Sequence, residues 1–239
     1  MKRETHPLRN GLKLCLLGMV FSTGVALASH YTDLRRIEPI HGDPAAGATK
    51  ATVCFACHGA NGNSIAPNFP RLAGQRPDYL YHRLRSFKSA PAADPYYSKS
   101  PMTALAAPLT DDAMRDLAAF FSSQPPTAGA AATPAGPEVE KGNLLFHGGD
   151  AARGIPPCQG CHGADANGSS TRTGQYLAYP SLRGQYAPYI VGRLSSFRDG
   201  RPHHTSNDMI MGGIAHALDD ASIQAIAAWL NSLAPAPAF

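Results

Sequence analysis

The sequence predicts an all-α protein made of two small helical domains that repeat one fold in tandem. Three observations support this prediction. The pattern Cys-x-x-Cys-His occurs twice, at residues 54–58 and 158–162. The stretches that follow the two copies match each other in the same order, which is typical of a duplicated domain. Apolar residues recur at helical spacing, whereas no convincing alternating strand pattern is present.

We interpret the first 28 residues as a secretory signal peptide. The basic residues that precede the apolar run are Lys2, Arg3, Arg9 and Lys13. The apolar run covers 14–28 and ends in the small-residue motif Ala-Leu-Ala, so we expect cleavage after Ala28 and export to the periplasm. An uncleaved membrane anchor is the alternative, which the short, glycine-containing run disfavours.

Export changes the interpretation of the charge. The whole chain carries a formal net charge of +4. Removing the four basic residues and the one acidic residue of the signal peptide lowers this to +1. The basic precursor is therefore no evidence for nucleic-acid binding, and we predict no nucleic-acid partner.

The cysteines point to one chemistry. Cys15 leaves with the signal peptide, and the other four lie inside the repeated pattern: Cys54, Cys57, Cys158 and Cys161. Paired cysteines at this spacing serve zinc sites, thiol redox pairs and covalent haem attachment. Haem attachment alone requires the adjacent histidine, which becomes the proximal iron ligand after the two thiols add to the haem vinyl groups. The sequence therefore predicts two c-type haems.

The repeat defines the domain organisation. Residues 69–75 match 179–185, residues 79–87 match 189–197, and residues 102–112 match 211–221. The numbering offset is 104 at the cysteines, 110 in the middle and 109 at the end, so the second copy holds six extra residues after its haem motif and has lost one later. We expect domains at 29–123 and 138–239, joined by a semi-extended Pro- and Ala-rich linker at 124–137.

Apolar periodicity predicts a middle helix and a final helix in each domain. The stripes of the final helices follow the N-cap candidates Thr110 and Asp219 and consist of Met114, Leu117, Ala118 and Phe121, and of Ile223, Ile226, Ala227 and Leu230. The stripes of the middle helices are Leu80, Leu84 and Phe87, and Ile190, Leu194 and Phe197. Because a protein core alone is marginal in so small a domain, we expect the buried haem to complete it.

The ordered motifs resemble a known family. CxxCHG is followed by Pro-x-Leu-x-Gly-Gln and by a Met ahead of an Asp-rich final helix, all duplicated behind a signal peptide. This set resembles the dihaem bacterial cytochromes of the cytochrome c4 type over roughly 43–233. The resemblance implies a periplasmic electron carrier with two small cytochrome c domains, each iron held by His and Met.

The resemblance also implies roles for individual residues. Cys54 and Cys57 bind the first haem, and Cys158 and Cys161 bind the second. His58 and His162 are the proximal ligands, Met102 and Met211 the distal ones. Pro70 and Pro180 offer a backbone carbonyl to the free nitrogen of those histidines, which fixes a metal-bound imidazole.

Two further methionines compete for the distal role. Met209 lies two residues before Met211, but it aligns with Ser100, whereas Met211 aligns with Met102. We therefore expect Met211 to bind the iron and Met209 to pack in the haem pocket. Met114 aligns with Ile223, so it belongs to the core.

The remaining histidines are weaker candidates. His203 and His204 lie in a loop before Met211, where exposed histidines are common, and His216 aligns with Ala107. His82 aligns with Gly192, and we expect it on the surface.

Function follows from the expected coordination. Two protein ligands fill both axial positions, so the iron has no open place for a substrate and serves electron transfer. The expected partners are redox proteins, with a donor such as a quinol-oxidising complex and an acceptor such as a terminal oxidase, and peripheral membrane association stays open. The alternatives are a haem subunit of a larger dehydrogenase complex, or a dihaem enzyme such as a peroxidase or thiosulfate dehydrogenase.

Overall fold

A computed structural model describes Met1 and residues 31–91, 94, 96–127, 134–200 and 204–235. The expected signal peptide lies outside the described residues, except for Met1. The first half of the fold contains α1 (Pro44–Lys50), α2 (Phe55–His58), α3 (Pro77–Ser89), α4 (Pro101–Ala106) and α5 (Asp111–Ser123). The second half contains α6 (Pro137–Gly148), α7 (Gln159–His162), α8 (Ala187–Arg198), α9 (Ser206–Ala215) and α10 (Asp220–Ser232). Short 3-10 turns connect them: η1 (Ala51–Cys54), η2 (Ala60–Gly62), η3 (Ala151–Arg153) and η4 (Gly174–Ala178).

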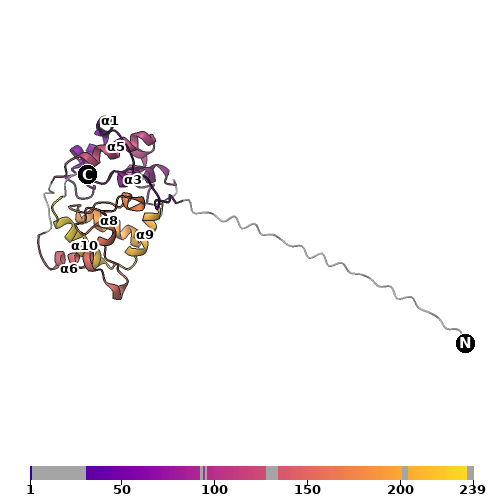
Figure 1. Cartoon of the computed structure of the whole chain (residues 1–239), viewed down its shortest axis with the longest axis vertical. Helices are drawn as coiled ribbons and strands as arrows, with labels where there is room; N and C mark the ends of the chain where they lie inside the picture. Colours follow the sequence, from indigo (N-terminus) through magenta and orange to yellow (C-terminus); the bar gives the residue numbers. More distant parts are fainter. Residues whose placement is uncertain (2–30, 92–93, 95, 128–133, 201–203, 236–239) are drawn as a thin grey trace. The chain divides into compact units, whose positions relative to one another are not determined.

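The prediction of an all-α fold is confirmed. In the part of the chain that the structure describes, no β-sheet forms, and strand-like pairing is limited to isolated bridges. The helices of the two halves correspond in order, from α1 with α6 to α5 with α10, and Figure 1 colours them along one gradient from indigo at the N-terminus to yellow at the C-terminus. The predicted caps of the final helices are present: Thr110 accepts from the amide of Ala113, and Asp219 accepts from that of Ser222.

Each half has its own apolar core. In the first half, α3 and α5 contribute the buried side chains Leu80, Tyr81, Met114, Leu117, Phe120 and Phe121. In the second half, α8 and α10 contribute Ile190, Ile223, Ile226, Trp229 and Leu230. The predicted stripes of the final helices therefore face these cores, and Met114, only 3% exposed, is core as expected.

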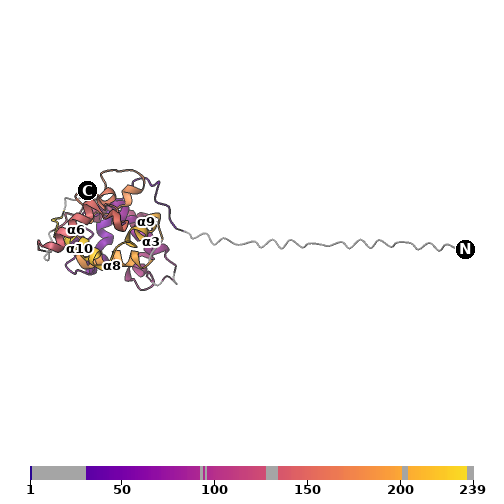
Figure 2. The same cartoon turned by 90° about the horizontal axis from the view of Figure 1, so that it is seen from below.

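The first helix of each half was not predicted. α1 packs against α5, and α6 packs against α10, which lies beside it in both views (Figures 1 and 2). A glycine makes each crossing close: a Cβ on Gly47 would lie 2.1 Å from the carbonyl oxygen of Asp116, and one on Gly142 would lie 1.9 Å from that of Ala225. No side chain larger than hydrogen fits at such a crossing without separating the helices.

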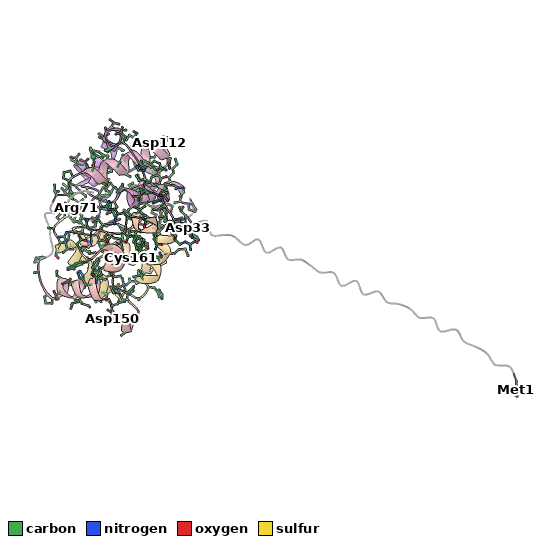
Figure 3. The ribbon with its side chains drawn as sticks, viewed as in Figure 1. Met1, Asp33, Arg71, Asp112, Asp150 and Cys161 are labelled. Atoms are coloured by element: carbon green, nitrogen blue, oxygen red, sulfur yellow. The ribbon has the colours of Figure 1, made fainter. Side chains whose placement is uncertain are left out.

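These glycines also reveal an insertion in the second half. Gly47 and Gly142 are 95 positions apart, whereas the two haem motifs are 104 apart, so the second half has nine extra residues before its motif. They form a turn in which Asp150 pairs with Ile155 and Arg153 binds the carboxylate of Asp150. The turn lies at the opposite end of the fold from Asp112 in Figure 3.

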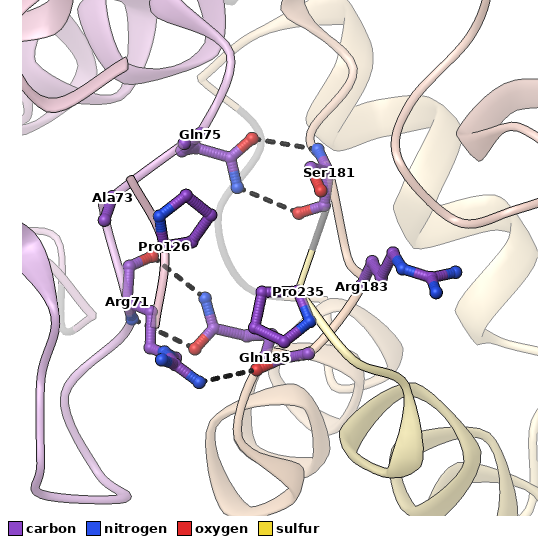
Figure 4. Close-up of a pocket in the computed structure, with 10 residues that line it drawn as sticks. Arg71, Ala73, Gln75, Pro126, Ser181, Arg183, Gln185 and Pro235 are labelled. Atoms are coloured by element: carbon purple, nitrogen blue, oxygen red, sulfur yellow. Dashed lines mark hydrogen bonds between the residues drawn. The ribbon is translucent and has the colours of Figure 1, made fainter. Parts of the chain in front are cut away.

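The two halves meet through reciprocal glutamines (Figure 4). The Gln75 amide donates to the carbonyl oxygen of Ser181 and accepts from its N–H, both at 2.8 Å. The Gln185 amide does the same to Arg71, at 3.1 and 3.0 Å. Gln185 lies 110 positions after Gln75, and Ser181 lies 110 positions after Arg71. The two contacts are therefore equivalent when the two halves are exchanged.

The linker is described only at its two ends. Its first residues lie against the first half, where Asn63 binds the backbone of Pro125 and Thr127. Its last predicted residue, Pro137, is already the first residue of α6. Residues 128–133, the centre of the predicted linker, lie outside the described residues.

Candidate haem sites

Each Cys-x-x-Cys-His pattern folds into one helical turn. Cys54 ends η1 and is followed by Cys57 and His58 on α2, and Cys158 precedes Cys161 and His162 on α7. Residues three apart are neighbours on one helical face, so both thiols of a pair are directed to the same side. None of these four cysteines forms a disulfide, and all four are partly buried.

The two histidines have matching partners. The Nδ1 atom of His58 lies 2.9 Å from the carbonyl oxygen of Pro70, and that of His162 lies 3.1 Å from the carbonyl oxygen of Pro180. A carbonyl only accepts, so the proton is on Nδ1 and the Nε2 lone pair is available for a metal.

The loop that carries each proline is held by two backbone hydrogen bonds to a single carbonyl oxygen. The carbonyl oxygen of Gly62 accepts from the amides of Leu72 and Ala73, and the carbonyl oxygen of Ala166 accepts from those of Leu182 and Arg183. Gly62 and Ala166 both adopt a positive φ, of 78° and 59°. The backbone geometry that presents the proline carbonyl is therefore the same in both halves.

The electrostatics favour neutral groups in both sites. Burial lowers the pKa of His58 and His162, although the bond to a proline carbonyl opposes this shift in each. Burial also raises the pKa of Cys54, and it raises that of Cys158 to about 11. A neutral imidazole is the form that binds iron, while an activated redox thiol needs the opposite shift.

A zinc site is disfavoured as well. Among the described residues, no group of three or more His, Cys, Asp or Glu side chains is placed to hold a metal ion. A zinc site would need both cysteine pairs around one metal ion, and the two pairs do not lie together in this way. Two free thiols beside a buried, correctly oriented imidazole, present in each half, fit the covalent attachment of one haem per half.

Met102 and Met211 occupy matching helical positions. Met102 lies in the first turn of α4, and its amide donates to the Ser100 hydroxyl. Met211 lies inside α9. Four residues later on the same helical face stand Ala106 and Ala215, both fully buried. Both methionines are thus on the helix face that turns toward the interior.

Met209 lies on the other face of α9. Two positions rotate a helix by about 200°, so Met209 and Met211 cannot face the same group. The Met209 side chain is 49% exposed, and Gly213, four residues later, is exposed too. The expectation that Met209 packs in the haem pocket therefore disagrees with its position, while the same geometry supports Met211.

One histidine prediction was wrong. His82, expected on the surface, is only 8% exposed and packs edge-on against Tyr81. Burial, with help from nearby Arg85 and Arg115, lowers the pKa of His82 to about 4. Its alignment with Gly192 misled the prediction, because the two halves fill this position differently.

The other histidines divide between surface and contact. His216 is exposed. His204 is partly buried and its Nε2 lies 3.0 Å from an Asp94 carboxylate oxygen in the other half, a partner that the sequence did not reveal. His203 lies outside the described residues.

Comparison with known families places both halves in one family. The cytochrome c family model matches residues 44–125 and 139–234. The chain is 42% identical to cytochrome c4 of Azotobacter vinelandii over 197 residues, which is 80% of this chain and 90% of the relative.

Two further similarities cover the same region. The thiosulfate dehydrogenase electron acceptor of Thiomonas intermedia is 35% identical over 231 residues, which is 95% of this chain and 93% of the relative. The crystal structure of reduced recombinant cytochrome c4 from Pseudomonas stutzeri matches with a TM-score of 0.68 and 37% identity, covering 81% of this chain and all of that one.

Proposed function

The chain belongs to the cytochrome c4 family of dihaem electron carriers, and from this premise we propose that it transfers electrons between respiratory proteins in the periplasm. Its donor is of the quinol-oxidising kind and its acceptor is a terminal oxidase. The observation that carries the proposal is the duplicated site: in each half a buried histidine is held by a proline carbonyl, with a methionine in matching register.

We assign the ligands half by half. Cys54 and Cys57 would form the thioether bonds to the first haem, and Cys158 and Cys161 those to the second. His58 and Met102 would bind the first iron, and His162 and Met211 the second. When bound, each haem supplies an iron that takes up and releases one electron.

The side chains fix how that iron behaves. The bond from the imidazole Nδ1–H to a proline carbonyl sets the ring orientation and keeps the proton away from the binding nitrogen. The soft methionine thioether would stabilise the ferrous state and raise the reduction potential. A histidine and a methionine bound to each iron would leave no free place there for a substrate, in agreement with the electron-carrier family.

The proposed location depends on the N-terminus. Residues 1–28 direct export and are removed near Ser29, which leaves domains at 29–123 and 138–239. Among the described residues, no helix is long and apolar enough to cross a membrane. Once the signal peptide is removed, we infer that association with membrane-bound partners is peripheral.

A second candidate function has its own support. The similarity to a thiosulfate dehydrogenase electron acceptor spans nearly the whole chain. In this version the donor is a thiosulfate dehydrogenase, and the protein accepts electrons from it without acting on thiosulfate itself.

Stopped-flow reduction of the purified holoprotein separates the candidates. The first proposal predicts rapid haem reduction by a quinol-oxidising complex and reoxidation by a terminal oxidase. Reduction by a thiosulfate dehydrogenase with thiosulfate, and none by the quinol-oxidising complex, would replace it with the second. Co-elution of the native protein with a dehydrogenase through size-exclusion chromatography would instead identify a subunit of a larger complex.

A further inference from the structure

The helix that carries Met211 begins at a strongly capped end. Thr205 is the N-cap of α9, and its hydroxyl accepts from the amide of Asp208. The Asp208 carboxylate in turn accepts from the amide of Thr205, which completes a capping box. Thr205 and Asp208 are both buried. The position of Met211, three residues after Asp208, is therefore tied to the position of this cap.

Residues of the first half form hydrogen bonds with the N-terminal end of α9. The backbone of Thr32 donates to the carbonyl oxygen of His204 at 2.7 Å and accepts from the amide of Ser206 at 3.0 Å. The amide of Leu34 donates to the Ser206 hydroxyl at 2.9 Å. The start of α9 is thus part of the contact between the two halves.

One charged pair joins this contact from α3. The Arg83 guanidinium lies 3.6 Å from an oxygen of the Asp208 carboxylate, and the two side chains are only 16% and 7% exposed. The guanidinium also donates to the Tyr97 hydroxyl at 3.3 Å and lies over the ring of Phe87. A buried carboxylate that loses its cation is costly, so Arg83 and Asp208 hold each other in place.

The other half lacks this arrangement. Arg193 is the counterpart of Arg83 on α8, and it donates to the hydroxyl of Tyr96 rather than to a carboxylate. The counterpart of Asp208 is Lys99, which is exposed. The helix that carries Met102 is capped by Ser100, from its own half. The Arg83–Asp208 pair therefore has no counterpart at the helix that carries Met102.

We propose that Arg83 is a positioning residue for Met211: from the first domain it fixes Asp208, and through it the start of α9, so that the distal ligand of the second haem depends on the first domain. This inference rests on the proposed assignment of Met211 as ligand. Displacing Met211 from the iron requires α9 to shift, and a shift of α9 disturbs the Arg83–Asp208 pair.

Competition with imidazole tests the proposal in the ferric holoprotein. Exogenous imidazole replaces the bound thioether, and the loss of the far-red sulfur-to-iron absorption reports each replacement. Arg83→Gln should raise the imidazole affinity of the second haem about tenfold and leave that of the first within about twofold, because a buried charged contact no longer resists the shift. Arg83→Lys should restore most of the wild-type affinity.

Matched variants make the result specific. Arg85→Gln removes the same charge from an exposed position on α3 and should change neither haem. Asp208→Asn should act like Arg83→Gln, and the double variant should exceed neither single variant. If Arg83→Gln yields no holoprotein, Asp208→Asn and Arg83→Lys provide the same comparison.

The outcomes separate this inference from the ligand assignment. Met211→Ala, which identifies the signal of the second haem, should remove its sulfur absorption. If it does not, the assignment fails. If it does, while the Arg83 and Asp208 variants change neither haem or change both equally, the assignment stands and the positioning role of Arg83 is overturned.

Discussion

The side-chain amide of Gln75 forms two hydrogen bonds with the backbone of Ser181 in the other domain, each 2.8 Å long. The same oxygen also accepts from the amide of Arg76, and the Gln75 side chain is buried. Gln185 repeats this arrangement toward Arg71. The two domains are thereby fixed against each other by hydrogen bonds that neither could form alone.

Replacing Gln75 with Met should therefore destabilise the holoprotein. The change keeps the length of the side chain and leaves the N–H and the carbonyl oxygen of the partly buried Ser181 without their partner. We expect the free energy of unfolding to fall by about 2–3 kcal/mol. Chemical denaturation measures this, and Gln224→Met on the exposed face of α10 is the control, with an expected change below about 0.5 kcal/mol. Equal effects of the two variants would contradict the stabilising role of the Gln75–Ser181 hydrogen bonds.

The glycine crossings give a second prediction. Gly47→Ala and Gly142→Ala should each lower the free energy of unfolding by about 1–3 kcal/mol, because the new methyl group meets the backbone of the facing helix. Gly192→Ala on α8 meets nothing within 4 Å and should stabilise by about 0.5–1 kcal/mol. Thermal unfolding of the three variants checks that the first two substitutions destabilise the protein and the third stabilises it. A stabilising Gly47→Ala would show that α1 and α5 are farther apart than in this structure.

His82 predicts a loss of stability in mild acid. Its pKa is lowered to about 4 in the folded protein, against about 6.5 in an unfolded chain. Between pH 4 and pH 6.5 the unfolded chain binds a proton on His82 that the folded protein does not bind. The contribution of neutral His82 to the free energy of unfolding is therefore fully present above about pH 6.5, and up to about 3 kcal/mol is lost as the pH falls toward 4.

The matched variant is His82→Leu, which cannot titrate. Denaturation of wild type and variant at pH 7 and pH 5 should show a smaller pH dependence in the variant. The same dependence in both proteins would mean that other groups dominate this pH range.

The choice between Met211 and Met209 is tested by paired variants. Met211→Ala should abolish the sulfur-to-iron absorption of the second haem and lower its reduction potential, because the thioether no longer stabilises the ferrous state. Met209→Ala should leave both nearly unchanged, since Met209 lies on the exposed face of α9. The reverse pattern would show that the alignment of the second domain is wrong by two residues.

The repeated motifs predicted more of the site than of the fold around it. The family resemblance placed His58 near Pro70 and His162 near Pro180, and the structure brings each pair together through local turns and a single loop. α1 was missed, since Pro44–Lys50 packs through glycine and alanine and shows little apolar periodicity. The repeated glutamines were visible in the alignment, but their partners lie in the other domain, over a hundred positions away.

Near-infrared magnetic circular dichroism of the ferric holoprotein tests the central claim most directly, because the charge-transfer bands of low-spin haem identify the pair of axial ligands. We predict two covalently bound haems, both with the bands of histidine–methionine ligation, and the loss of half of that signal in Met102→Ala as well as in Met211→Ala. A bis-histidine or high-spin signal from either haem in the wild-type protein would contradict the assignment of two closed electron-transfer sites.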